Sequence, residues 1–209
     1  MLLLAALLLT GVAAGAGTVP GDIALARAIQ QPASPEIDAV ARIASLIGDD
    51  FPAMVILALI GVALLISRGR RDLALFLAVA TGLRAIGPGL KVLIGSPRPT
   101  LEAVAIVAQA DGLGFPSGHA LGAALFYGAI AVIAPQVVSN RVLARGIQAA
   151  AAIMMVLIAL SRVRLGVHWP SDVAGGLLFG LGFVCLLQSA LMGLWGTRTP
   201  LSRLRRERG

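Results

Sequence analysis

The sequence predicts an all-α integral membrane protein built as a bundle of six transmembrane helices. Composition carries most of this prediction: 58% of the 209 residues are apolar, 13% are charged, and the mean hydropathy is +0.92. These values lie far above those of an ordinary soluble domain. The charged residues are also clustered, which leaves several apolar windows of about 20 residues, the length that crosses about 30 Å of hydrocarbon. A soluble protein with an apolar core does not account for so many windows.

Residues 2–19 form a short apolar segment that we interpret as the first span. The alternative is a cleaved signal peptide, because Ala13-Ala-Gly-Ala16 resembles a cleavage region, but the positively charged start of a signal peptide is missing. Residues 20–50 are mixed in composition. Within them, Ser34-Pro-Glu-Ile-Asp38 is typical of a helix start, and the apolar residues that follow keep helical spacing. This pattern predicts an amphipathic helix on or near the membrane interface.

The remaining apolar runs predict five further spans. They cover approximately residues 51–67, 73–94, 118–138, 146–163 and 173–195. Arg84 falls near the middle of one of them, and a charge inside a span is a functional hypothesis by default. We expect one membrane domain over residues 1–209. Its parts are the first span or signal-like segment (1–19), the amphipathic region (20–50), a five-span catalytic core (51–195) and a basic tail (196–209).

Basic residues indicate the orientation of this bundle. They cluster after the second and fourth spans and in the tail: Arg68, Arg70, Arg71, Arg141, Arg145, Arg198, Arg203, Arg205, Arg206 and Arg208. The positive-inside rule places these segments and both termini in the cytoplasm. Residues 20–50, 95–117 and 164–172 then lie on the outer face. The net charge of +7 therefore reflects membrane orientation, and we expect no nucleic-acid partner.

The rarest titratable side chains all fall on that outer face. Lys91 is the only lysine, and with Arg98 and Arg162 it makes three cations at the ends of apolar segments. Cations in this position suit a phosphate, because arginine gives bidentate contacts and lysine a point charge. The single cysteine, Cys185, excludes an intrachain disulfide and a cysteine-based zinc site.

Two histidines complete the pattern. Pro116-Ser-Gly-His119 precedes an apolar helix, whose backbone N–H groups make an anion site. His168 and Asp172 are four residues apart, so the carboxylate can fix one imidazole nitrogen and leave the other free to attack. His119 then supplies a second acid–base group. Each feature alone has an ordinary explanation as an anchor, turn or helix start, but their conjunction on one side predicts an active site at the outer membrane face.

Three segments carry a resemblance to a known family. Lys91-x6-Arg98-Pro99, Pro116-Ser-Gly-His119 and Ser161-Arg162-x5-His168-x3-Asp172 resemble the signature of the type 2 phosphatidic acid phosphatase superfamily. The resemblance covers roughly residues 35–195. The superfamily includes bacterial membrane lipid phosphatases and shares its site with vanadium haloperoxidases. Many members have a further arginine two residues before the Arg-Pro arginine, and here Ser96 stands in that position.

The resemblance implies a role for each signature residue. His168 is the nucleophile that forms a phosphohistidine, Asp172 orients it, and His119 protonates the leaving group and then activates water. The phosphoryl oxygens are bound by Lys91, Arg98, Ser117, Gly118 and Arg162. No metal and no cofactor is implied, in agreement with a site that lacks a carboxylate cluster.

We therefore expect a multi-pass phosphatase of the bacterial inner membrane that hydrolyses a lipid phosphate or diphosphate on the periplasmic side. The candidate substrates are undecaprenyl diphosphate, phosphatidylglycerol phosphate and phosphatidic acid. Alternatives are a lipid phosphotransferase with the same site and a non-catalytic lipid-binding or transport protein, while the spans count against a haloperoxidase. Trp169 and Arg164 are expected to be interfacial anchors. The sequence leaves the oligomeric state open.

Overall fold

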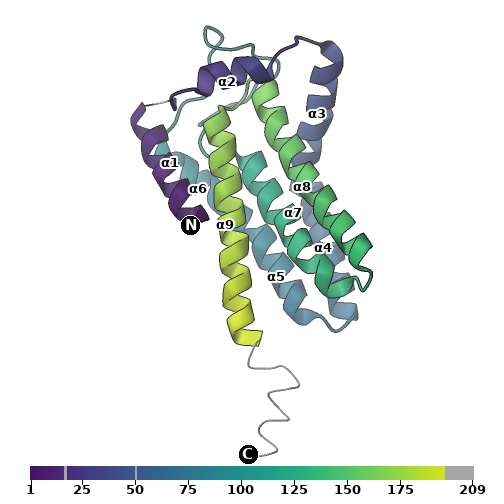
Figure 1. Cartoon of the computed structure of the whole chain (residues 1–209). Coiled ribbons are helices and arrows are strands. Elements are labelled where there is room, and N and C mark those ends of the chain that lie inside the picture. The colour runs from purple at the N-terminus through teal and green to yellow at the C-terminus, as the bar shows by residue number, and fades with distance from the viewer. Residues whose placement is uncertain (17, 50, 196–209) are drawn as a thin grey trace, which may run out of the picture.

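The computed structural model describes residues 1–16, 18–49 and 51–195, and their regular structure is helical throughout (Figure 1). The helices are α1 (Leu2–Ala16), α2 (Asp22–Ile29), α3 (Pro35–Asp49), α4 (Phe51–Ser67), α5 (Arg71–Gly82), the 3₁₀ helix η1 (Leu83–Ile86), α6 (Gly87–Ile94), α7 (Gly118–Val137), α8 (Arg141–Arg164) and α9 (Pro170–Trp195). The predicted basic tail, 196–209, lies outside the described residues.

Long apolar helices confirm the prediction of an all-α membrane protein. Within the described ranges, four helical stretches are long and apolar enough to cross a membrane: Arg71–Ile94, Gly118–Val137, Arg141–Arg164 and Pro170–Leu191. The pair α3 and α4, bent by 52°, makes a fifth if it counts as one span, and α1 is a shorter apolar helix. The structure thus supports four to five spans, and the sixth stays a prediction.

The helix α7 forms the centre of the bundle and packs against both α8 and α9. Small residues allow α7 and α9 to approach closely, as is common between helices in lipid. A Cβ on Gly176 of α9 would lie 2.6 Å from the Ser117 carbonyl oxygen, and one on Gly180 would meet Ala124 of α7. The close approach places the first turns of α7 and α9 beside each other, where the Ser117 N–H donates to the Asp172 carbonyl at 2.9 Å.

The predicted span 73–94 is interrupted at Arg84. The chain leaves α5, makes the 3₁₀ turn η1 and continues as α6, with Pro88 in the first turn of α6. Arg84 lies in this turn, and its Nη1 donates to the Gly48 carbonyl of α3 at 3.3 Å. Its guanidinium also covers Gly122 of α7, where a Cβ would clash with it. Arg84 therefore links three helices at the break.

The region 20–50 forms two helices at one end of the bundle. In Figure 1, α2 lies across that end, whereas α3 runs downward alongside α8. The predicted amphipathic helix is α3, and it buries Ala41, Ala44 and Ser45 against the bundle. We call the end that carries α2, the loop 95–117 and the start of α9 the site end.

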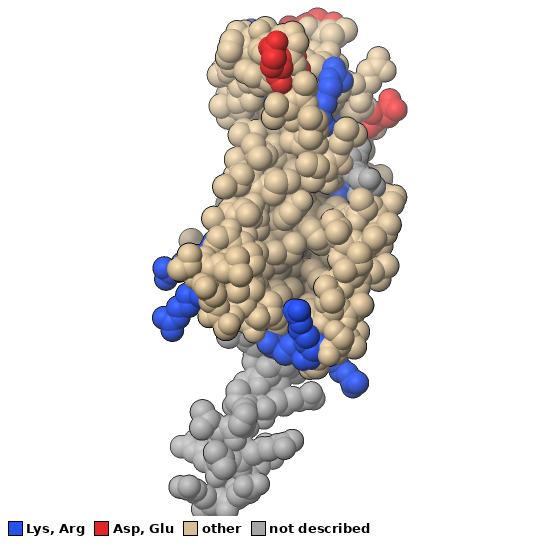
Figure 2. All heavy atoms as spheres, turned by 90° about the vertical axis from the view of Figure 1, so that its right-hand side faces the viewer, with Lys and Arg blue, Asp and Glu red and all other residues tan. Residues whose placement is uncertain are grey.

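On the face shown in Figure 2, charged side chains gather toward the two ends of the molecule and leave an apolar belt between them. At the end opposite the site end, Arg70 pairs with Asp72 at 3.2 Å and donates to the Gln136 carbonyl at 2.9 Å. We call this the basic end, since the α4–α5 turn and the starts of α5 and α8 there carry Arg68, Arg70, Arg71, Arg141 and Arg145 of the sequence prediction. Which end faces the cytoplasm stays a prediction.

Candidate active site

The structure brings the predicted site residues together at the site end. A cavity of about 540 Å³ is lined by six of them: Lys91, Arg98, Gly118, His119, Arg162 and His168. They come from the end of α6, the loop 95–117, the start of α7, the end of α8 and the turn before α9. The other two, Ser117 and Asp172, are fully buried and are bonded or adjacent to lining residues.

His168 is buried between an anion and a cation. Its Nδ1 lies 3.1 Å from Asp172 Oδ2, and its Nε2 lies 3.2 Å from Arg98 Nη1. A carboxylate beside Nδ1 and a guanidinium beside Nε2 select the tautomer with the proton on Nδ1. Burial first, and then the positive charge of Arg98, hold the pKa of His168 well below its ordinary value. The ring is therefore neutral, and its unprotonated Nε2 faces the Arg98 guanidinium.

The local sequence builds this pair into the start of a helix. Trp169 stands at the N-cap position of α9, Pro170 at the first position and Asp172 at the third. Asp172 Oδ2 accepts the Trp169 N–H at 3.0 Å, as the third residue does in a capping box. The same oxygen faces His168, so one carboxylate both completes the helix start and orients the imidazole.

Two of the cations are held by backbone carbonyls. Lys91 Nζ donates to the Leu113 and Gly114 carbonyls at 2.6 and 2.9 Å. Arg98 donates to the carbonyls of Asp111 and Gly112, both at 3.1 Å, and of Val167 at 2.6 Å. These partners are neutral, so the contacts fix the cations without cancelling their charge. Arg162 donates to the Ser45 hydroxyl of α3.

The start of α7 adds donors to the same cavity. Gly118 is the first residue of α7, and Ser117 is its N-cap. The Ser117 hydroxyl is buried without a hydrogen-bond partner among the described residues. The free N–H groups and the positive dipole end of a helix favour an anion. His119, in the first turn, lines the cavity as well.

Two expectations for individual residues were wrong. Trp169 is 3% exposed and packs in a cluster that includes Val104 and Val173, so it is a core residue. Arg164 is also buried, and its Nε donates to Asp38 Oδ1 at 2.7 Å. Its guanidinium reaches the carbonyls of Ile29, Pro32 and Ser34 as well. Neither side chain serves as an interfacial anchor.

The structure adds residues that the sequence prediction missed. Arg42 and Ser45 of α3 line the cavity, and Arg42 Nη2 donates to the Val107 carbonyl at 2.6 Å. Their position on the polar face of an amphipathic helix was a usable signal. Asp22 of α2 is buried and bonded to Ser171, and nothing in the sequence around it indicated a partner so distant. Within the described ranges, no group of three His, Cys, Asp or Glu side chains could hold a metal ion.

Comparison with known proteins identifies the family. The sequence profile of the PAP2 superfamily matches residues 72–193, more than half of the chain. The decaprenylphosphoryl-5-phosphoribose phosphatase of Mycobacterium tuberculosis is 34% identical over 166 residues, covering 77% of this chain and 85% of that protein. Phosphatidylglycerophosphatase B of Bacillus subtilis is 32% identical over 130 residues, covering 60% of this chain and 61% of that protein.

Solved structures show the same fold. The chain superposes on the PAP2-type phosphatidylglycerolphosphate phosphatase of Bacillus subtilis with a TM-score of 0.77 and 25% identity, covering 90% of this chain and 92% of the other. LpxE of Aquifex aeolicus shares the fold, with a TM-score of 0.59 and 22% identity, over 82% of this chain and 96% of the other. The chain therefore belongs to the PAP2 superfamily of membrane lipid phosphatases.

Proposed function

We propose that this protein hydrolyses the terminal phosphoryl group of a membrane lipid phosphate or diphosphate, through a phosphohistidine at His168. One observation carries the proposal: a neutral imidazole faces a cavity lined by cations, with its Nδ1 held by the Asp172 carboxylate at 3.1 Å. A nucleophile with a fixed tautomer beside a cradle for a phosphoryl group is the arrangement that phosphoryl transfer to nitrogen requires.

The reaction runs in two displacements. Lys91, Arg98 and Arg162 bind the phosphoryl oxygens, assisted by the Gly118 amide and the Ser117 hydroxyl. Nε2 of His168 attacks phosphorus while the bond to the lipid oxygen breaks, and protonated His119 gives its proton to that oxygen. A water then attacks phosphorus from the vacated side, and His119 takes the proton of that water. The P–N bond breaks, and both histidines return to their starting states as inorganic phosphate leaves.

Cations and amides carry the developing charge in this scheme, which therefore needs neither a metal nor a cofactor. The donors are held in place before substrate arrives, as the carbonyl contacts of Lys91 and Arg98 illustrate. Full activity in the presence of EDTA is the expected result for purified protein. A loss that added Mg²⁺ restores would contradict the scheme.

A second, apolar cavity supports a lipid substrate. It has a volume of about 310 Å³, shares Leu46 with the catalytic cavity, and lies between α3–α4 and α7. Met54, Leu57, Phe126 and Tyr127 contribute to its walls. A substrate held by its hydrocarbon chains could place them there while its headgroup reaches His168.

Topology completes the proposal. Residues 1–209 form one catalytic membrane domain, in which α1 and α4 count as the first two spans. Six spans then place the cavity on the periplasmic side of a bacterial inner membrane and the tail in the cytoplasm. The separation of the site end from the basic end supports this orientation.

A fourth cation, Arg42, favours some of the candidate lipid substrates over others. Arg42 lines the catalytic cavity with Lys91, Arg98 and Arg162, and no Asp or Glu stands among the described residues of the lining. A phosphate monoester carries a charge of about −1.5 to −2, so this cavity suits a substrate with a second anionic group. Undecaprenyl diphosphate and phosphatidylglycerol phosphate have one, and phosphatidic acid does not. The name of the mycobacterial relative also gives a substrate with two phosphoryl groups.

Phosphate release from the three lipids by purified protein in detergent tests the function. We expect wild-type protein to release phosphate and His168→Ala to release none, while both variants elute and melt alike. Release that survives in His168→Ala would overturn the phosphohistidine mechanism. Transfer of phosphate to an added acceptor lipid in place of water would identify a phosphotransferase.

Arg42→Ala tests the second anionic group. We expect KM for phosphatidylglycerol phosphate to rise about tenfold, the effect of losing roughly 1.4 kcal/mol of binding, with little change for phosphatidic acid. Arg27→Ala is the matched control, because Arg27 is likewise exposed and donates to a carbonyl of the loop 95–117, that of Ala103 at 2.7 Å. Arg27 lies outside the catalytic cavity. Equal losses on both lipids would contradict the assignment.

A further inference from the structure

The helix α2 contacts several segments that carry site residues, although it lies outside the matched family region. Figure 1 shows it lying across the site end, near the start of α9. Its first residue, Asp22, is 4% exposed. A buried carboxylate needs donors to offset the loss of water, and the donors of Asp22 show what it holds.

Asp22 receives three hydrogen bonds. Oδ1 accepts the Ser171 N–H at 2.9 Å, and Oδ2 accepts the Ser171 hydroxyl at 2.6 Å. Oδ2 also accepts the Val19 N–H at 2.9 Å. Two of these donors belong to Ser171, which immediately precedes Asp172 and is 149 positions away along the chain. The carboxylate therefore fastens α2 to the first turn of α9.

The N-cap residue of α9 offers no side-chain acceptor for the Ser171 N–H. An N-cap side chain normally accepts the N–H of the second or third helical residue, but the N-cap here is Trp169, which has no acceptor. Pro170 follows with no N–H, so Ser171 is the first residue of α9 with an orphan donor. Asp22 accepts that N–H and adds a negative charge at the positive end of the helix dipole.

We propose that Asp22 is a positioning residue for the His168–Asp172 pair, which it controls by capping α9 from outside the helix. The proposal rests on the proposed role of His168 as nucleophile. Asp172 is the next residue after the double bond to Asp22, and its carboxylate must stay within reach of His168 Nδ1. Loss of Asp22 leaves the buried N–H and O–H of Ser171 without an acceptor, and the first turn of α9 shifts to find new partners.

The phosphate-binding cations are held differently. Lys91 and Arg98 lie on α6 and the loop 95–117, and their carbonyl partners belong to residues 111–114 and 167. None of these contacts includes Asp22. Removing Asp22 should therefore disturb the chemical step at His168 more than the binding of the phosphoryl group.

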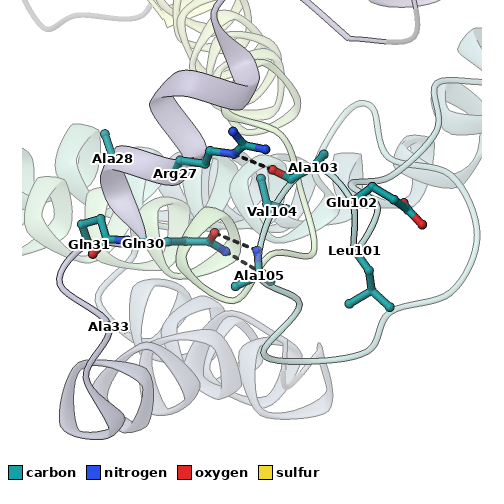
Figure 3. Close-up of a pocket in the computed structure, with 10 residues that line it drawn as sticks. All are labelled: Arg27, Ala28, Gln30, Gln31, Ala33, Leu101, Glu102, Ala103, Val104 and Ala105. Carbon is teal, nitrogen blue, oxygen red and sulfur yellow. Dashed lines mark hydrogen bonds between the residues drawn. The ribbon is translucent and has the colours of Figure 1, made fainter.

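The other end of α2 provides an internal control (Figure 3). There, Arg27 donates to the Ala103 carbonyl at 2.7 Å, and Gln30 bonds both backbone groups of Ala105, at 2.7 and 3.1 Å. These residues line a separate cavity that shares no residue with the catalytic one. Arg27 thus attaches the same helix to the loop 95–117 without touching α9.

Steady-state kinetics of the full chain in detergent test the proposal. For Asp22→Ala we expect kcat to fall about 10- to 100-fold, the scale of a misplaced catalytic group, while KM changes by less than about threefold. Asp22→Asn should lose less, because its amide oxygen still accepts one bond. Ser171→Ala should lose least, because the backbone N–H remains bonded to Asp22. Arg27→Ala should keep the wild-type kcat.

A structural role alone would give a different result. A lower melting temperature with unchanged kcat in the surviving protein, or a rise in KM alone, would overturn the proposal. Should Asp22→Ala fail to fold, Asp22→Asn and Ser171→Ala replace it in the test. A fall in kcat that is larger than the change in KM supports the proposal, and a change in KM alone contradicts it.

The imidazole itself separates this proposal from the proposed function. The chain has two histidines, so in a His119→Ala background the ¹⁵N signals report His168 alone. We expect Asp22→Ala to lower the fraction of the tautomer protonated on Nδ1, and an unchanged tautomer would overturn the positioning role. If the wild-type protein released no phosphate while Asp22→Ala still lowered the fraction protonated on Nδ1, the proposed function would be rejected and the positioning role kept.

Discussion

At the scale of single residues, the neutral charge state of His168 follows from its surroundings in the folded protein. A histidine in a loop is usually solvated, but this one is 2% exposed and lies between Asp172 and Arg98. Burial and the neighbouring guanidinium both disfavour the imidazolium. The lowered pKa keeps the ring neutral as the pH falls, and a neutral ring is the form that attacks phosphorus.

This effect can be measured directly. In a His119→Ala background, we expect the ¹⁵N signals of His168 to remain those of a neutral imidazole at and below pH of about 6.5, the ordinary value. Burial and the neighbouring positive charge both lower the pKa of His168, so its protonation needs a more acidic solution. A titration midpoint at or above that value would show that the ring is solvated or that Asp172 dominates it.

Residue types at the site could be predicted, but their burial could not. Both histidines, Asp172 and the cations stand in fixed spacings that indicate phosphate chemistry. Trp169 and Arg164 lie in the same segment as His168 and were expected at the membrane interface. They are buried, because α2 and the Pro32–Ser34 turn cover them. A hydropathy pattern reports the environment of a segment and carries no information on which distant segment packs over it.

At the scale of helices, long apolar runs were sufficient to place α4, α7, α8 and α9 to within a few residues. The interruption of the span 73–94 was not predicted. Gly82, Gly87, Pro88 and Gly89 surround Arg84, and glycine and proline weaken a helix by their backbone properties. Spans of membrane proteins tolerate them often, so the sequence alone does not show that the backbone turns to a 3₁₀ helix at Leu83–Ile86.

The pair formed by Arg164 and Asp38 predicts how α3 is attached to α8. The guanidinium is buried and the two atoms lie 2.7 Å apart. We expect Asp38→Asn to lower the free energy of unfolding by about 1–3 kcal/mol, because a buried charge loses its carboxylate partner. Thermal melting in detergent measures this, and kcat should stay near wild type. A fall in kcat without a fall in stability would instead assign Asp38 to the site.

At the scale of the whole molecule, the site and most turn arginines lie at opposite ends of an apolar belt. This separation follows from the alternation of up and down helices: every second connection between consecutive spans lies at the same end of the bundle. The prediction that the rare titratable residues share one face of the membrane depended only on this alternation of the spans. The membrane side of each end depends on insertion, which the fold does not encode by itself.

Labelling of engineered cysteines tests the orientation. Cys185 is the only native cysteine, so a Cys185→Ala background is clean. We expect an impermeant thiol reagent added to intact cells to label Glu102→Cys, which lies in the loop 95–117. The same reagent should label Ser139→Cys, in the α7–α8 turn, only after the cells are opened. The reverse pattern would place the active site in the cytoplasm.

The carbonyl contacts of Lys91 and Arg98 have a consequence after turnover. Because neutral partners hold these cations, the emptied cavity keeps its positive charge and should hold the released phosphate. We expect inorganic phosphate to inhibit competitively, and more strongly at low ionic strength. Absence of inhibition at millimolar phosphate would contradict this. The released phosphate would compete with the next substrate for the same cations, so the rate at a given lipid concentration would fall as the surrounding phosphate concentration rises.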